Sequence, residues 1–314
     1  MGIDNQYINH IFIIQRIINS ILLILIILLS GCVSTGIVDY AYIPGEIVPP
    51  LNYKPDWKLL HPGLELTSWN QSSPHLAVTA LRIDLEHPER DIFVTPGYYP
   101  IDSDYLLDYE DPSNRERNFP SRTTSQFLED FDCIAAVNAT PFRPFRILQG
   151  KPQQAVGVVI SEGVIYSSPS KYAYFSLSKV GSIEFLETPL KSENISDIDQ
   201  AAGGFFIILK DGKNIGVQGE RKPLSIMGLS EDERYLYMVV IDGEDKNWSI
   251  GASLWEGSEW MKSLGAYNVM ILDGGGSSTL VIKGEEGKSL LLNKPSGLNL
   301  FSKERPVAVH IGIK

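Results

Sequence analysis

The sequence predicts a domain of the α/β or α+β class, with a mixed, largely β-rich sheet core, few helices and a single main domain. Short apolar or alternating stretches, separated by Gly, Pro and Asp, recur from residue 76 to the C-terminus and are typical of strands. The clearest helical pattern is one short segment at 253–264. A chain of 314 residues with 43% hydrophobic residues can bury a sizeable core.

The N-terminus carries an apolar leader, Ile11–Ile14 and Ile21–Leu29, which runs into Leu29–Ser-Gly-Cys32. This ending resembles a bacterial lipobox. The resemblance implies cleavage after Gly31 and acylation of Cys32, which would attach the protein to a membrane through a lipid anchor. An uncleaved membrane anchor is the alternative interpretation.

The leader and the prolines that follow it divide the chain into three parts. We assign residues 1–31 to a lipoprotein signal peptide, 32–75 to a Pro-rich tether and 76–314 to the main domain. The expected location is the bacterial cell envelope, outside the cytoplasm.

The composition argues against several classes of partner and site. With 27 basic and 38 acidic residues the net charge is −11, which disfavours nucleic acid as a partner. The five His are scattered without ligand spacing, so no metal site is expected, and His310 reads as a strand residue. Cys133 lies in an apolar run and reads as a core residue.

From residue 76 onward the sequence pattern predicts mainly strands. A polar, acidic stretch at 96–120 is expected to be a surface loop. Thr124 is placed to cap a short helix that ends at Phe131, and Asp211–Gly212 predicts a turn. The expected strands are Leu76–Asp84, Ile92–Thr95, Cys133–Val137, Val156–Ile160, Gly163–Ser167, Tyr172–Leu177, Ile183–Leu186, a strand after Gly203–Gly204, Tyr235–Ile241, Asn268–Leu272, Thr279–Ile282, Leu290–Leu292 and Val307–Ile313.

The helical segment joins two strands that each end in a carboxylate. Ser253 and Glu256 have the spacing of a capping box, and Gly265 is placed to end the helix. Asp242 and Asp273 follow the flanking strands. If these strands are parallel neighbours, the two carboxylates lie at one sheet edge.

The segment from Asp273 to Ser278 reads Asp-Gly-Gly-Gly-Ser-Ser between two apolar runs, and predicts two strands joined by a tight glycine turn. No helix follows the glycines, so a Rossmann or P-loop site is not expected. An anion would instead bind to a nest of backbone N–H groups.

Paired carboxylates and arginines are the chemistry that this pattern favours. Cleavage of a sugar linkage uses two carboxyl groups, and Asp242 and Asp273 are the obvious pair. The alternative for each is a turn Asp that binds backbone N–H groups. A Ser-His-Asp site at Ser277 stays open, although the serine lacks a strand-to-helix elbow. Arginines suited to holding phosphate are Arg143, Arg146, Arg221 and Arg305.

The segment Gly251–Leu280, with Asp273–Gly-Gly-Gly-Ser-Ser-Thr-Leu280 at its end, resembles the signature of the phosphodiester glycosidase family of uncovering-enzyme-like domains. Weaker resemblances extend over about residues 76–314. They lie at Asn138–Phe142, Gly203–Gly204, Val239–Gly243, Asn293 and Glu304–Arg305.

The resemblance implies hydrolysis of a sugar-1-phosphodiester in a glycan or sugar-phosphate substrate, without a required organic cofactor. Asp273 would act as general acid/base and Asp242 as the second catalytic residue. The substrate-binding residues would be Asn138, Arg143, Gly204, Gly274, Gly275, Gly276, Ser277, Ser278, Asn293 and Arg305.

Three places depart from the family pattern, and at one of them Ala139 and Thr140 follow Asn138 where the family prefers glycine. Leu224 stands where the family has an arginine, and Glu244 stands where an arginine usually follows Asp-Gly. The loss of two cations would weaken binding of a phosphodiester. A non-catalytic, glycan-binding envelope lipoprotein is therefore the competing hypothesis.

Overall fold

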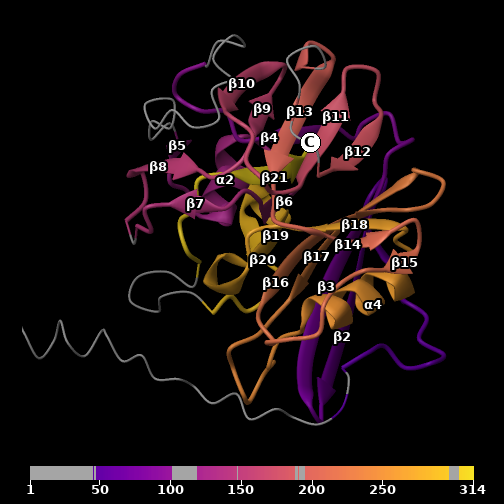
Figure 1. Ribbon diagram of the computed structural model, residues 1–314. Helices are drawn as coiled ribbons and strands as arrows, with labels where there is room; N and C mark the ends of the chain where they lie inside the picture. The colour runs from indigo at the N-terminus through magenta and orange to yellow at the C-terminus, as the bar shows by residue number, and fades with distance from the viewer. Residues whose placement is uncertain are drawn as a thin grey trace, which may run out of the picture. The chain divides into compact units, whose positions relative to one another are not determined.

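Figure 1 shows the fold as a computed structural model. The structure describes Gly45 and residues 47–100, 119–146, 148–187, 190, 195–296 and 304–314. These residues belong to one unit, Gly45–Lys314. The predicted signal peptide, Cys32 and most of the predicted loop at 96–120 lie outside the described residues. Within the described ranges, no helix is long and apolar enough to cross a membrane.

An eight-stranded antiparallel sheet, called here the main sheet, carries the strands that lead to both predicted carboxylates. Its two longest ladders share the predicted strand at 76–84. This strand pairs with residues 64–72 on one side and with the predicted strand at 235–241 on the other. These strands are almost continuously apolar because both faces of the sheet are covered. Across the sheet the order is β1 (Lys58–His61), β2 (Leu64–Ser72), β3 (His75–Asp84), β17 (Tyr235–Ile241), β16 (Leu224–Leu229), β18 (Asn268–Ile271), β14 (Ile207–Lys210) and β15 (Lys213–Asn214).

Three smaller antiparallel sheets accompany the main sheet. The β6 sheet consists of β20 (Ser289–Leu291), β19 (Leu280–Lys283), β6 (Ala135–Asn138), β21 (His310–Ile313) and β4 (Ile92–Val94). The β13 sheet consists of β10 (Val164–Ser167), β9 (Val159–Ser161), β13 (Ile198–Gly203), β11 (Tyr174–Ser178) and β12 (Ile183–Leu186). The third consists of β5 (Phe119–Pro120), β8 (Pro152–Ala155) and β7 (Phe142–Arg143).

The described ranges contain two α-helices, α2 (Thr124–Asp130) and α4 (Leu254–Leu264), and two 3-10 helices, η3 (Gly275–Ser277) and η4 (Glu285–Gly287). The predicted capping box of α4 is confirmed, with Ser253 as N-cap and Gly265 in the left-handed conformation as C-cap. Ser258 is buried and donates to the Ile208 carbonyl at 2.9 Å, so α4 packs closely on the main sheet. For α2, the side chain of Thr123, and not of Thr124, caps the helix.

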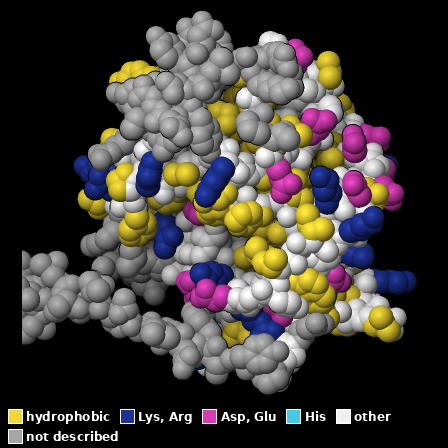
Figure 2. Space-filling view, viewed as in Figure 1, with side chains coloured by type: hydrophobic (Ala, Val, Ile, Leu, Met, Phe, Trp, Pro, Cys, Tyr) yellow, Lys and Arg dark blue, Asp and Glu magenta, His cyan; other side chains and the backbone are white. Residues whose placement is uncertain are grey.

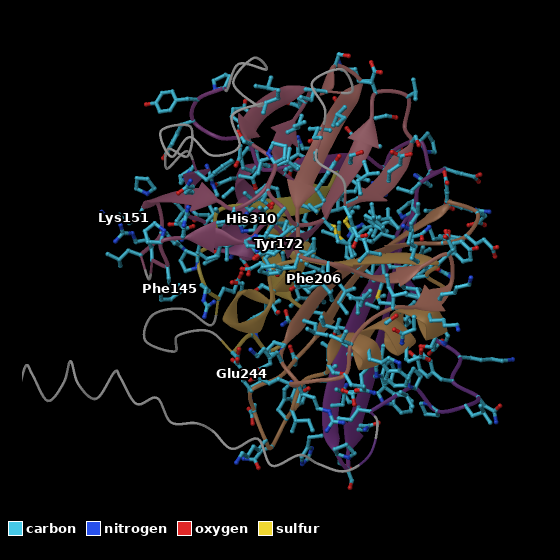
Figure 3. All side chains as sticks on the ribbon, in the orientation of Figure 1. Phe145, Lys151, Tyr172, Phe206, Glu244 and His310 are labelled. Atoms are coloured by element: carbon cyan, nitrogen blue, oxygen red, sulfur yellow. The ribbon has the colours of Figure 1, made fainter. Side chains whose placement is uncertain are left out.

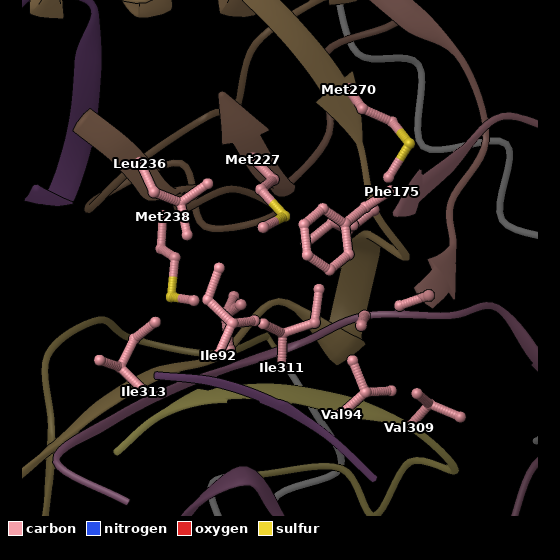
Figure 4. Close-up of a cluster of buried hydrophobic side chains, with 14 of the residues drawn as sticks. Ile92, Val94, Phe175, Met227, Leu236, Met238, Met270, Val309, Ile311 and Ile313 are labelled. Carbon is pink, nitrogen blue, oxygen red and sulfur yellow. The ribbon is translucent and has the colours of Figure 1, made fainter. Parts of the chain in front are cut away.

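The core lies in layers on both sides of the main sheet. On one face, α4 and its Trp260 cover buried residues such as Ile226 and Val239. On the other face, the main sheet packs against the β6 sheet, where Met227 and Met238 share a cluster with Ile311 (Figure 4). Helix α2 covers the far side of the β6 sheet. The predicted β-rich fold with few helices is confirmed, and because every ladder between described strands is antiparallel, the class is α+β.

The folded domain begins earlier in the chain than the sequence indicated. Residues 58–72, which lie within the predicted tether, form β1 and β2 at the edge of the main sheet. Tyr53 packs edge-on against Trp69 at 5.4 Å and against Trp260 of α4 at 5.5 Å between ring centroids. Prolines without periodic spacing therefore did not mark a tether here, because aromatic side chains fix this segment to the sheet.

Candidate active site

The two predicted carboxylates follow strands whose C-terminal ends lie on the same side of the main sheet. Strands β17 and β18 are both antiparallel to β16, which lies between them. They therefore run parallel to each other, but they are not the neighbours that the sequence suggested. Leu224, at the start of β16, pairs with Ile241. The backbone just before it, at Pro223, thus lies between the two acidic strand ends.

The segment Asp273–Ser278, called here the glycine loop, does not close a hairpin. It leads from β18 in the main sheet to β19 in the β6 sheet, and η3 forms within it. The predicted strands on both sides are confirmed, but they belong to different sheets. The loop is therefore a crossing between two layers of the fold, with its position set by both.

Each of the three glycines has its own reason to lack a side chain. A Cβ at Gly274 would lie 2.9 Å from the Pro223 carbonyl oxygen, and a Cβ at Gly276 would lie 2.4 Å from the Arg305 guanidinium. Gly275 has a φ of +60°, which glycine adopts most readily. The run of glycines thus lets the loop pass Pro223 on one side and Arg305 on the other.

The backbone N–H groups of the glycine loop are largely used within the protein. Gly275 N–H donates to the Pro223 carbonyl, and Ser277 and Ser278 N–H donate to Gly274 and Gly275 carbonyls. The N–H of Gly274 hydrogen-bonds to Asp273. These four N–H groups therefore do not form the predicted nest. The positive charge beside the loop is that of the Arg305 guanidinium.

Asp273 is the carboxylate with the most unusual surroundings. Burial raises the pKa of its carboxyl to about 6, although hydrogen bonds from the Ser277 hydroxyl and the Gly274 N–H and the charge of Arg305 act to lower it. The residue remains partly exposed. A partly exposed carboxyl that titrates near pH 6 is suited to general acid or base catalysis.

Asn138 at the end of β6 holds the glycine loop from behind. It is fully buried, and its side-chain amide donates to the Asp273 carbonyl oxygen at 2.6 Å. Its side-chain oxygen accepts from the Ser225 hydroxyl at 2.7 Å and from the Thr279 N–H at 3.1 Å. Asn138 thus ties β6, β16 and the glycine loop together, and the structure gives it a positioning role.

Arg305 lies over the glycine loop and connects it to the segment after β7. Its guanidinium donates to the Ser277 hydroxyl at 3.3 Å and stacks on Phe145 at 4.7 Å. Arg143, two residues before Phe145, is exposed and donates to Gln154 at 3.4 Å. Arg305 is therefore brought to Asp273, while Arg143 lies at the margin of the same region.

Asp242 is buried and differs from Asp273 in that strong donors surround its carboxylate. It accepts from the Trp248 indole at 2.7 Å, from the Asn293 amide at 2.9 Å and from the Lys294 N–H at 3.0 Å. Burial raises the pKa of Asp242, against these hydrogen bonds. The Asn293 amide also donates to the Ser278 carbonyl at 3.0 Å and so joins Asp242 to the glycine loop. Direct roles of Asp242 and Asn293 in catalysis or binding stay predictions.

An aromatic group that we did not predict stands beside the end of β18. Gly204 lies so close to Ile271 that a Cβ would be 2.4 Å from its carbonyl oxygen, and Phe205 N–H donates to the same oxygen. Tyr172 packs edge-on against Phe205 and Phe206, and Phe206 is 50% exposed. Phe145, Tyr172 and Phe206 are labelled in Figure 3. Figure 2 shows the molecule from the same side, with hydrophobic and basic side chains on the face toward the viewer. The Phe-Phe pair directly after the glycines was the signal available in the sequence.

Several buried polar atoms near the glycine loop have no partner within the described part of the chain. They include hydroxyls of the loop and of the residue after Ala139, and a guanidinium nitrogen. These atoms are Thr140 Oγ1, Ser278 Oγ, Thr279 Oγ1 and Arg305 Nε. Buried polar groups are usually hydrogen-bonded, so this concentration marks a place for a polar ligand or ordered water.

The other titratable groups that the sequence singled out serve the fold. His310 is buried and stacks on Phe127 at 4.7 Å, and burial lowers the pKa of its imidazole to about 3. Cys133 is a buried core residue, as predicted, and burial raises the pKa of its thiol to about 12. Among the described residues, no group of three His, Cys, Asp or Glu side chains could hold a metal ion.

The departures from the family pattern can also be placed. Leu224 is buried in the core beneath α4, in contact with Gly257. Arg221 forms a salt bridge with Glu256 of α4 at 2.6 Å and is therefore engaged on that face of the sheet. Glu244 is exposed, with a φ of +60°.

A carboxyl group of raised pKa beside an arginine, at the end of a strand of the main sheet, is an arrangement suited to an acid–base hydrolase. The profile of one such hydrolase family, phosphodiester glycosidase, matches residues 131–314, which is more than half of the chain. The chain belongs to the phosphodiester glycosidase family. None of the curated proteins matches it.

Two of the solved structures that match the chain illustrate the shared fold. The catalytic domain of zebrafish N-acetylglucosamine-1-phosphodiester alpha-N-acetylglucosaminidase, auto-inhibited by its pro-peptide, matches with a TM-score of 0.58 and 20% identity over 82% of this chain and 85% of that chain. A hypothetical protein from Synechocystis matches with a TM-score of 0.54 and 15% identity over 85% of this chain and 64% of that chain. At these identities the likeness concerns the fold.

Proposed function

We propose that this protein hydrolyses a sugar-1-phosphodiester linkage in a cell-envelope or extracellular glycan. The observation that carries the proposal is the chain of contacts from Arg305 through the Ser277 hydroxyl to Asp273. It sets a cation for the phosphodiester next to a carboxyl group that can exchange a proton near pH 6. Membership of the phosphodiester glycosidase family supports the reaction class.

In the proposed reaction a water molecule attacks the anomeric carbon of the sugar. The bond between that carbon and the phosphate oxygen breaks, and its electron pair leaves with the oxygen as a phosphomonoester. The second pKa of a phosphomonoester is about 6, so this leaving group needs little protonation. Asp273 in its ionised form therefore has the role of general base and accepts a proton from the attacking water.

Arg305 has the role of holding the phosphate. Its guanidinium is fixed by Ser277 and Phe145, which orients it at little further entropic cost when a ligand binds. Asn138 positions the backbone of Asp273 without contacting the substrate. In this proposal Asp242 braces the adjacent strand end through Asn293 and does not exchange protons.

Attack at carbon and attack at phosphorus can be told apart by isotope labelling. The purified protein would be incubated with UDP-N-acetylglucosamine, and with the methyl diester of N-acetylglucosamine 1-phosphate, in ¹⁸O-labelled water. We expect the label in the released sugar and none in the phosphate product. Label in the phosphate, or no release from either compound, would reject the proposal.

A matched pair of variants ties the activity to the site. Asp273→Asn removes the proposed base with little change in shape. Asp211→Asn makes the same change at another Asp-Gly sequence, in an exposed turn where φ is +49° and asparagine is readily accepted. Only the first variant should lose activity.

The proposed site of action is the bacterial cell envelope, with the protein attached through a lipid on Cys32. The lipobox-like sequence Leu29–Ser-Gly-Cys32 supports this proposal. Cys32→Ser should release the protein from the membrane fraction of a producing bacterium. Retention of this variant in the membrane would instead favour an uncleaved anchor.

A non-catalytic glycan-binding protein is the second candidate, and the position of Leu224 favours it. The leucine is buried against Gly257 beneath α4, where the family pattern has an arginine. Arg221 does not replace that cation at the site, since it pairs with Glu256. Saccharide binding without any sugar release in the isotope experiment would support this candidate.

A further inference from the structure

A pocket beside Asp242, called here the second pocket because it is separate from the glycine loop, has no part in the proposed reaction. It has a volume of about 360 Å³, within the usual range of small-molecule sites. Strands β2 and β3 form one wall, through Ser68, Asn70 and Thr79. The segments that follow β17 and β20 form the other wall, through Trp248 and Lys294.

Trp248 offers this pocket an aromatic surface in a fixed orientation. Its indole N–H donates to the buried Asp242 carboxylate at 2.7 Å, while 39% of the residue remains exposed. The Lys294 ammonium lies 5.8 Å from the ring centroid. A ring held in this way can pack against the C–H face of a sugar, at small cost in side-chain entropy.

The facing wall presents polar groups that are ready to bind hydroxyls. Ser68 and Asn70 are exposed, so the hydroxyl and the amide can be reached by a ligand. Ser68 pairs in register with Thr79, and Asn70 follows two residues later on the same face of β2. The Thr79 hydroxyl makes one long contact, 3.5 Å to the Leu292 carbonyl. These groups form a short row along the strands.

The charges of the pocket disfavour a phosphate and favour an uncharged ligand. Its charged side chains are the Asp242 carboxylate and the Lys294 ammonium, and no arginine lines it. The ammonium is already paired with Asp245 at 2.8 Å. An entering anion would thus meet the negative charges of Asp242 and Asp245 with no unpaired cation to offset them. An uncharged ligand rich in hydroxyls would meet matching hydrogen-bonding groups.

The second pocket is joined to the glycine loop by one side chain. The Asn293 amide donates both to Asp242 in the pocket and to the Ser278 carbonyl of the loop. A substrate that extends from the phosphate position near Arg305 would therefore have a binding surface close to the scissile bond.

We propose that the second pocket binds one uncharged hexose or N-acetylhexosamine ring of the glycan substrate. This inference rests on the proposed function, because it assigns part of that substrate to the pocket. It predicts that the protein prefers a glycosyl phosphodiester carrying a further sugar ring to one with a single sugar.

The test follows the indole N–H signal of Trp248 by NMR, assigned with Trp248→Phe. The purified protein would be titrated with triacetylchitotriose, with maltotriose and with inorganic phosphate. We expect a saturable shift of the signal with at least one saccharide and none with phosphate. Ser68→Tyr, which fills the pocket without touching the Asp242 hydrogen bonds, should weaken saccharide binding at least tenfold.

Ser72→Tyr provides the matched control, since Ser72 is exposed on the same strand and does not line the pocket. It should bind saccharide as the natural protein does. No saccharide shift, a shift with phosphate alone, or equal binding by the two tyrosine variants would overturn the inference. Asp273→Asn should bind saccharide normally, so a failure of the proposed reaction would leave this readout intact.

Discussion

The Arg305 guanidinium donates to the Ser277 hydroxyl at 3.3 Å, and that hydroxyl also hydrogen-bonds to Asp273. Ser277 is fully buried, so the hydroxyl at the centre of this relay is shielded from bulk water. A serine has one hydroxyl proton, which is used toward Asp273 while its lone pair accepts from Arg305. The arrangement connects a binding cation to a titratable carboxyl without a direct salt bridge, and this is consistent with a pKa that stays raised.

Replacing Asp273 by Asn should lower kcat by about 10²- to 10⁴-fold, the usual contribution of a general base. KM should change little, because the amide keeps the shape of the loop. Steady-state kinetics on the methyl diester would measure both constants, with Asp211→Asn as control. Equal activity of the two variants would show that Asp273 is not the base.

The pH dependence of kcat/KM should report the titration of Asp273. Activity should rise with pH and level off above an apparent pKa of about 6, because only the ionised carboxylate accepts a proton. In Arg305→Gln the apparent pKa should be higher, because the removed charge had lowered it. A profile that falls with rising pH through this range would instead assign Asp273 the role of general acid.

The same titration should affect stability with a definite sign. The pKa of Asp273 is raised from 3.8 to about 6 in the folded state, so folding favours the protonated form. Relative to Asp273→Asn, the natural protein should lose stability as pH rises from about 4 to about 6, by at most about 3 kcal/mol. Urea denaturation of both proteins at several pH values gives the difference. A difference that is constant over this range would mean that the pKa is not raised.

Replacing Gly276 by Ala should disturb Arg305 more than it disturbs the fold. The added methyl would lie 2.4 Å from the guanidinium, so Arg305 has to move. We expect a KM for the phosphodiester at least several-fold higher. Gly275→Ala is the comparison. Nothing lies within 4 Å of the Cβ that this change adds, but the φ of residue 275 is +60°. That variant should lose about 1 kcal/mol of stability and keep Arg305 in place. Identical effects on KM would contradict the role given to Gly276.

Glu256 should be needed for stability and not for chemistry. Its carboxylate is buried, pairs with Arg221 and accepts from the N–H of Ile47, which fixes the start of the described chain to α4. Burial raises the pKa of Glu256, but the hydrogen bonds from Arg221, Ser253 and Ile47 outweigh it, so that the pKa is lowered.

Glu256→Gln should therefore lower the free energy of unfolding by about 3 kcal/mol, because it removes the buried carboxylate that pairs with the Arg221 charge. Chemical denaturation measures this change, and Glu285→Gln at an exposed position serves as control. A loss below 0.5 kcal/mol would indicate that water replaces the pair.

Local patterns in the sequence were sufficient for the elements whose stability is local. The capping box at Ser253 and Glu256 and the stop at Gly265 determine the ends of α4, because the groups that satisfy its first and last turns are within a few residues. The same holds for the turn at Asp211–Gly212 between β14 and β15. The apolar run at 235–241 identified a strand that is buried on both faces.

Other predictions failed where distant segments decide the outcome. The helix between the strands ending at Asp242 and Asp273 favoured a pair of parallel neighbours, but β16 lies between the two strands. The prolines of 33–75 suggested a tether, although residues 58–72 complete the main sheet. Strand order and edge pairing depend on partners far away in sequence, which local patterns do not specify.

By itself the sequence determined the β-rich class, through its short apolar and alternating stretches. The short-range spacing of glycine, serine and aspartate carried the family resemblance and singled out the glycine loop. The tertiary structure alone decided that Asp273 and Asp242 have different surroundings. Arg305, which follows Asp273 by 32 positions in the printed chain, lies over the loop, and the strand that follows it, β21, pairs with β6 in the same sheet as β19. Burial and hydrogen-bond partners set the chemistry of a carboxyl group, and both are properties of the packed fold.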